Sequence, residues 1–287
     1  MRSSARFFEF ALSLVGLAAA LAGCGDEFGP RVCDEPSRAC DRPAQSASQT
    51  TLRAIRARAP AYPVGRPVDV RAVHVLAVDT YDEPYSNGST GDTWVAEITP
   101  AGDSANRFAP CPLLPGGRER MCGISLFSAS LSPVGYQPFD GDLVDLTGGA
   151  YEEFVCATCG IRTSGRASPF PDGRYLPQIS RGTARAAGSA PPLTPIPVTI
   201  DELVAHNQEL IGTLVVLEDV TAMSAPDARF GEIRLTAGSN ALTLTQALVR
   251  IPNVSAGTHW DRVVGIVHYF YSPKLIPRSM ADLVGQR

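Results

Sequence analysis

Two cysteines in the segment FVCATCG, Cys156 and Cys159, have the spacing of a zinc knuckle, a redox couple or a structural crosslink. A redox couple places its first cysteine at the amino terminus of a helix, where the helix dipole lowers the thiol pKa. The run GIRTSG after Cys159 is typical of a loop instead. A four-thiolate zinc site could add Cys111 and Cys122, but their wide spacing does not fit a knuckle. The pattern therefore favours a disulfide if the protein works in an oxidising compartment.

The other residue types form no known catalytic motif. The four histidines stand alone, without a partner at metal-ligand spacing: His74, His206, His259 and His268. A P-loop requires a Gly-Lys-Ser/Thr sequence, and the only lysine, Lys274, follows a proline. The segment GSTG at 88–91 has the wrong spacing for a serine-hydrolase elbow. We therefore expect no catalytic residues, no cofactor and no metal site.

Two groups of acids could suggest chemistry. The loop at 79–92 holds four acids whose oxygens could bind calcium outside the cytoplasm: Asp79, Asp82, Glu83 and Asp92. They lack the regular spacing of a calcium loop, so we expect a solvated loop and leave calcium binding open. Glu152 and Glu153 are adjacent in a strand pattern and so face opposite sides of it, which argues against an acid–base pair.

The amino terminus indicates the compartment. Arg2 and Arg6 precede an apolar run that is shorter than the ~20 residues of a membrane-spanning helix and ends at a cysteine. The sequence Leu21-Ala22-Gly23-Cys24 resembles the lipobox of bacterial lipoproteins. This resemblance covers residues 1–24 and implies that 1–23 are a signal peptide and that Cys24 is acylated. The acyl chains would anchor the protein in the membrane of the cell envelope. Gly25 is no inner-membrane retention signal, so we favour the outer membrane.

An exported protein makes the other cysteines candidates for disulfides. Six remain after Cys24, and fifteen pairings of them are possible. Proximity in the sequence suggests three pairs: Cys33 with Cys40, Cys111 with Cys122, and Cys156 with Cys159.

Composition and repeats divide the exported part of the chain. Residues 24–50 are rich in proline, serine and charges, which is typical of a flexible, disordered linker. A helical start at 51–60 and several β-type runs then fill residues 51–188. After the proline-rich seam at 189–197, the same order of elements returns in 198–287, beginning with the helical pattern at 197–206. The chain is therefore predicted to be all-β, with two tandem units.

Each unit contains five strand runs, and the first run changes its apolar phase partway, as a bent strand does. In the first unit this run is 68–78, and in the second it is 210–220, with Gly212 as the expected bend point. The pattern resembles two OB-fold-like five-stranded barrels, such as those of envelope proteins and those beside secreted nuclease domains. No nuclease domain follows the second unit, so any nuclease role is expected to be accessory.

The OB resemblance implies a binding surface on the second and third strands, flanked by the loops after strands one and four. In the first unit this surface would include Trp94, with Tyr81 and Tyr85 on the adjoining loop. These rings could stack on a base or a sugar, although Trp94 also fits a core position.

We therefore expect a non-enzymatic lipoprotein that acts as a binding or scaffold module for a protein, glycan or oligonucleotide ligand. The alternative is an accessory OB module of a secreted nuclease or phosphodiesterase system. The formal net charge of −4 argues against nucleic acid as a ligand. The arginines concentrate at one place only, namely Arg53, Arg56, Arg58 and Arg71, which we expect to be solvated.

Overall fold

The computed structural model describes residues 50–58, 64–79, 92–103, 105–133, 136–155, 170 and 174–287. Several predicted features fall outside these ranges: the signal peptide, the linker, and the side chains of Cys24, Cys33, Cys40, Tyr81, Tyr85, Cys156 and Cys159. In the described part, no helix combines the length and the apolar character that a bilayer crossing requires.

The first unit is a closed β-barrel. Its strands are β1 (Pro67–Val78), β2 (Thr93–Pro100), β3 (Glu119–Phe127), β5 (Asp142–Phe154) and β6 (Leu176–Ser180). The neighbours around the barrel are β1-β2-β3-β6-β5, and β5 closes the barrel on β1. All pairs are antiparallel except β3 with β6, which is parallel. This is the strand arrangement of an OB-like barrel.

The second unit repeats this arrangement. Its strands are β9 (Leu214–Ala222), β10 (Ile233–Thr236), β11 (Ala241–Leu244), β12 (His259–Phe270) and β13 (Ser272–Ile276). The order is β9-β10-β11-β13-β12, with β12 paired back to β9 and a parallel pair between β11 and β13. The prediction of an all-β chain with two tandem five-stranded barrels is therefore confirmed.

Short elements extend both barrels. β4 (Ser130–Ser132) and β7 (Thr183–Ser189) continue the first sheet beyond β5, while β8 (Ile196–Pro197) and β14 (Leu283–Val284) flank the second. The helices are α1 (Leu52–Arg56) before the first barrel, α2 (Ile200–Ala205) and α3 (Asn207–Leu210) before the second, and the 3₁₀ turn η2 (Met280–Asp282). Thr199 caps α2 through a reciprocal pair of hydrogen bonds with Glu202, which fixes where the helix starts.

The first strand of each barrel is irregular, as its sequence pattern indicates. In β1 the register with β5 shifts between Val70 and Val73, where Ala72 has a positive φ of 49°. In β9 Asp219 has a positive φ of 55°. Gly212 also has a positive φ, of 80°, but it lies before β9 rather than within it. The expected strand run 210–220 is therefore too long at its start, because α3 ends at Leu210 and the chain turns at Gly212.

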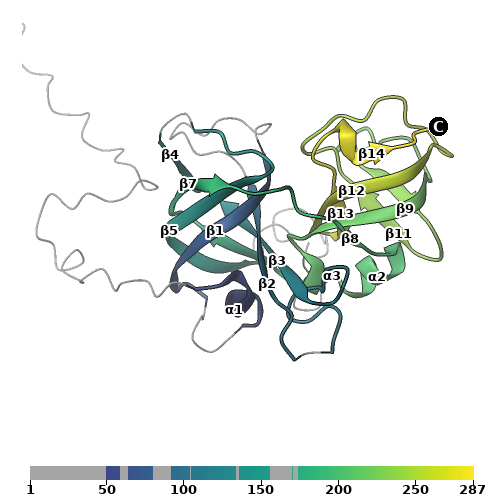
Figure 1. The fold of residues 1–287 in the computed structure, drawn as a ribbon. Coiled ribbons are helices and arrows are strands. Elements are labelled where there is room, and N and C mark those ends of the chain that lie inside the picture. The colour runs from purple at the N-terminus through teal and green to yellow at the C-terminus, as the bar shows by residue number, and fades with distance from the viewer. Residues whose placement is uncertain are drawn as a thin grey trace, which may run out of the picture.

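The apolar residues form a core inside each barrel and a shared layer between the barrels. Val95, Cys122 and Ile124 belong to the core of the first barrel. Their strand neighbours Trp94 and Met121 instead belong to the cluster that includes the core of the second barrel. Because successive residues of a strand face opposite sides, β2 and β3 are buried on both faces. Figure 1 shows the two barrels side by side, with β2 and β3 on the side of the first barrel nearest α3.

Candidate binding site

The face of β2 and β3 that should bind ligand in the first barrel is covered by the second barrel. Trp94 is 3% exposed, and Ala96 and Met121 are fully buried. The sulfur of Met121 lies 3.4 Å from the amide nitrogen of Leu214, which donates to it. The indole of Trp94 therefore packs between the barrels and presents no stacking face to a ligand. The adjoining Tyr81 and Tyr85 lie outside the described residues.

Glycine allows the two barrels to approach this closely. The backbone of Gly123 in β3 lies directly against the backbone of Gly212. A Cβ atom on Gly123 would stand 2.6 Å from the nitrogen of Thr213, closer than real Cβ atoms approach a neighbour. A Cβ atom on Gly212 would stand 2.7 Å from the carbonyl carbon of Gly123. Neither position can carry a larger residue unless the barrels move apart.

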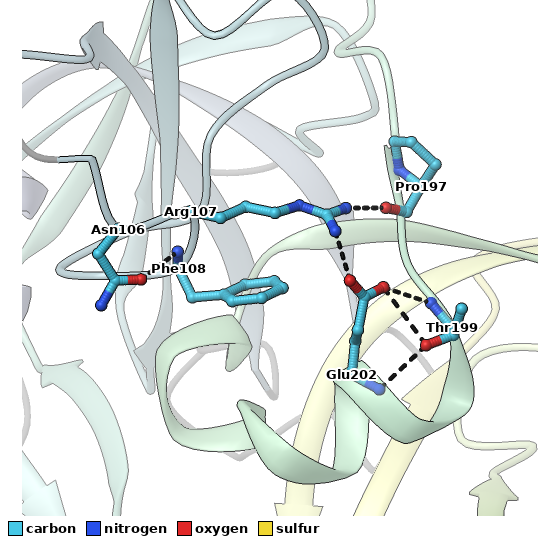
Figure 2. Close-up of polar contacts among 6 residues, drawn as sticks. All are labelled: Asn106, Arg107, Phe108, Pro197, Thr199 and Glu202. Carbon is cyan, nitrogen blue, oxygen red and sulfur yellow. Dashed lines mark hydrogen bonds and ion pairs between the residues drawn. The ribbon is translucent and has the colours of Figure 1, made fainter.

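The loop between β2 and β3 reaches over to α2 of the second barrel (Figure 2). The guanidinium of Arg107 pairs with the carboxylate of Glu202 and donates a 2.6 Å hydrogen bond to the carbonyl of Pro197. The ring of Phe108 stacks on the imidazole of His206, with centroids 4.1 Å apart and planes 17° apart. Phe108 is 6% exposed, so this contact is part of the shared apolar layer.

A disulfide and a buried arginine hold this loop in shape. Cys111 in the loop and Cys122 in β3 are disulfide-bonded, which confirms this predicted pair. The side chain of Arg120 is buried and donates to the carbonyls of Ala101, Asn106 and Cys111, at 3.1 and 2.8 Å for the first two. The loop therefore needs no regular secondary structure to present Arg107 and Phe108.

α1 also joins the two barrels. Arg56 donates to the carbonyls of Gln208 and Glu209 at 2.6 and 3.1 Å, and its burial lowers the pKa of the guanidinium. Arg58 instead pairs with Glu153 at the first barrel. The prediction that this group of arginines is solvated is therefore wrong for Arg56, whose partners come from the second barrel and cannot be read from the local sequence.

The corresponding face of the second barrel is not covered by the first barrel and is partly exposed, although Thr243 in β11 is 6% exposed and the side chain of Lys274 in β13 is 12% exposed. Arg234 in β10 is exposed, and it lies opposite Thr243 in β11. The hydroxyl of Thr243 lies 3.2 Å from that of Ser272 in β13, and Lys274 in the same strand pairs with Glu232. These side chains form a polar surface with cationic groups on strands two, three and five of the barrel.

The loop between β9 and β10 is braced beside this face. The carboxylate of Asp227 accepts hydrogen bonds from the amides of Arg229, Phe230 and Glu232 at 2.9, 2.8 and 2.7 Å. These backbone donors lower the pKa of Asp227. Gln246, in the loop after β11, donates to the carbonyl of Gly231 and accepts from the amide of Ile251, both at 2.6 Å.

Phe230 stands at the tip of the same loop and is 64% exposed. The loop sequence, APDARFG, contains residues typical of a turn, but no role was predicted for this loop. An aspartate followed by a glycine after a strand run could have identified the turn. The exposure of the phenylalanine could not have been found in this way.

The four histidines are separate from one another. His206 stacks on Phe108, and the ring of His259 lies 3.3 and 3.5 Å from the carboxylates of Asp219 and Asp261. Burial lowers the pKa of His74, and burial together with Lys274 lowers that of His268 to about 4. Among the described residues, no group of three or more acids, histidines and cysteines is arranged to hold a metal.

The structure describes four of the acidic candidates: Asp79, Asp92, Glu152 and Glu153. Asp92 accepts a 2.9 Å hydrogen bond from the hydroxyl of Ser125, and the amide of Asp79 donates to the carbonyl of Asp92. The rest of the proposed calcium loop, 80–91, lies outside the described residues. Glu152 contacts Gln178, whereas Glu153 contacts Arg58 and Tyr151, so the two carboxylates have different neighbours.

Searches against known protein families and against curated proteins find no match to this sequence.

Proposed function

We propose that this protein is a lipid-anchored lipoprotein of the bacterial envelope, held through Cys24, and that it works as a non-enzymatic binding module. Its ligand surface is the partly exposed face of the second barrel around Arg234, together with the adjoining loop at Phe230. The first barrel serves as a scaffold that holds this surface in a fixed orientation.

The observation that supports this proposal is the difference between two equivalent faces. The β2–β3 face is filled by the second barrel, with Trp94 and Met121 buried. The β10–β11 face of an equally closed barrel carries the exposed Arg234, and the loop that leads into β10 carries the exposed Phe230. A large exposed aromatic beside cations on a braced loop is typical of a recognition surface.

Site-specific photocrosslinking in the native host tests the proposed surface. A photoreactive amino acid replaces Arg234 in the full-length protein, and as a control it replaces Arg185, an exposed arginine on β7 of the first barrel. We expect a discrete adduct from position 234 and none from position 185. Equal labelling at both positions, or none at either, would contradict the assignment of the surface.

Metabolic labelling with a fatty-acid analogue tests the anchor separately. The wild-type protein should incorporate the label and remain with the membrane fraction, whereas C24A should do neither. Incorporation of label into C24A would show that the anchor lies elsewhere.

A second function, an accessory module for a secreted nuclease or phosphodiesterase, is favoured by the cations around this face. Titration with a single-stranded oligonucleotide at low and high salt distinguishes it. Binding that weakens steeply with salt would support this alternative, and no binding at low salt would exclude it.

A further inference from the structure

The loops after β9 and after β11 line an open cavity of about 550 Å³ in the second barrel. Its lining includes two arginines, Arg229 and Arg250, together with the ring of Phe230. From this cavity we infer a binding site for a phosphorylated ring compound, in which both guanidiniums contact the phosphate and Phe230 stacks on the ring. The inference rests on the proposed binding role of this barrel and specifies the class of ligand.

The charge of the cavity favours an anion. Asp227 is the only acid in the lining, and its carboxylate is already bound by three backbone amides of its own loop. In the described part of the chain, neither Arg229 nor Arg250 forms a salt bridge with a carboxylate. Two guanidiniums facing one cavity can bind the oxygens of a phosphate with paired hydrogen bonds.

The position of Phe230 indicates that the ligand also contains a ring. The guanidinium of Arg229 lies 4.7 Å from the centroid of this ring and covers one of its faces. The side chain nevertheless remains 64% exposed, so the opposite face is available to a ligand. A ring that stacks there would lie on the side of Phe230 opposite Arg229, so its phosphate would have to reach the guanidinium past the edge of the phenylalanine ring.

The loops are built in advance of binding. Asp227 fixes the first loop through its three amide contacts, and Gln246 ties it to the second loop through Gly231 and Ile251. Because these contacts order both loops without a ligand, binding should cost little conformational entropy. The cavity is therefore a formed site rather than a gap between loose segments.

Five probes separate the contributions of phosphate and ring. They are adenosine 5′-monophosphate, glucose 6-phosphate, adenosine, glucose and inorganic phosphate, each titrated into the purified full-length protein and followed by calorimetry and amide NMR shifts. We expect at least one phosphorylated ring compound to bind about tenfold more tightly than inorganic phosphate, with shifts at Gly231 and Gln246. The preferred compound shows whether the ring is a base or a sugar.

Alanine variants test whether the two arginines and Phe230 contribute to binding. R229A and R250A should each weaken binding of the phosphorylated compound about tenfold, as the loss of a charged hydrogen-bonding partner does. F230A should reduce it to the level of inorganic phosphate, and R185A should have no effect.

Two results would overturn the inference: no binding by any probe, or binding that R229A, R250A and F230A leave unchanged. A crosslink from position 234 without phosphate binding would overturn this inference alone and leave the proposed function intact.

Discussion

Gly123 of the first barrel and Gly212 of the second are in backbone-to-backbone contact, with no space for a side chain on either. This contact lies in the center of the apolar layer between the barrels, flanked by Trp94 and Met121. We therefore expect the two OB-like units to move together. The most direct tests therefore alter this layer and the loop that supports it.

Replacement of Gly212 by alanine should separate the barrels locally. The new methyl group would meet the backbone of Gly123, and we expect overpacking to lower the free energy of unfolding by about 1–3 kcal/mol. Gly116 also has a positive φ but has open space around it, so G116A measures the backbone strain without the contact. Urea denaturation of both variants gives the comparison. Equal losses would mean that the glycine contact is unimportant.

Removal of the Cys111–Cys122 disulfide should weaken the loop that carries Arg107 and Phe108. The bond closes a short loop, with a sequence separation of 11, so C111A/C122A should lose about 3 kcal/mol of unfolding free energy. Urea denaturation without reductant measures this loss. With reductant present throughout, the parent protein should approach the variant. If the parent protein keeps the same advantage in unfolding free energy over the variant when it is reduced, the loss comes from packing alone.

Phe108 and Arg107, both drawn in Figure 2, should contribute different amounts to the stability of the protein. F108A removes a buried ring and should cost about 3–5 kcal/mol, whereas R107A breaks a partly exposed ion pair and should cost at most about 1 kcal/mol. T199A, which removes the cap of α2, should fall near 1 kcal/mol. Thermal or urea unfolding would rank the three variants. A larger loss of unfolding free energy for R107A than for F108A would contradict this account of the contact between the barrels.

Stability should decrease in mild acid because of His268. Its pKa is lowered to about 4 in the folded protein, below the ~6.5 of an unfolded chain, so the unfolded state binds the proton more readily. The free energy of unfolding should therefore fall as the pH drops from about 6.5 to about 4, by at most about 3 kcal/mol. H268Q should flatten this profile, although the lowered pKa of His74 will leave a residual slope in the same direction. An unchanged profile in H268Q would assign the acid sensitivity to another group.

The two barrels could be predicted from the sequence because their strands alternate apolar and polar residues and recur in the same order. The disulfide Cys111–Cys122 followed from proximity in the chain. The contact between the barrels could not be predicted from the sequence. A strand that contains Trp94, Met121 or Gly123 has the same sequence pattern whether it faces solvent or another barrel. β7 was also missed, since its residues TARAAGS are mostly small and exposed, and it forms by pairing with β5 and β4.

The position of α1 has a mechanical consequence. The amide of Thr50 donates to Asp69 in β1, Leu52 and Ile55 are buried in the first barrel, and Arg56 holds two carbonyls of the second. A pulling force applied at Thr50 would therefore reach both barrels through the same helix. The two barrels would share the force, so neither barrel would have to unfold before the other bore part of it.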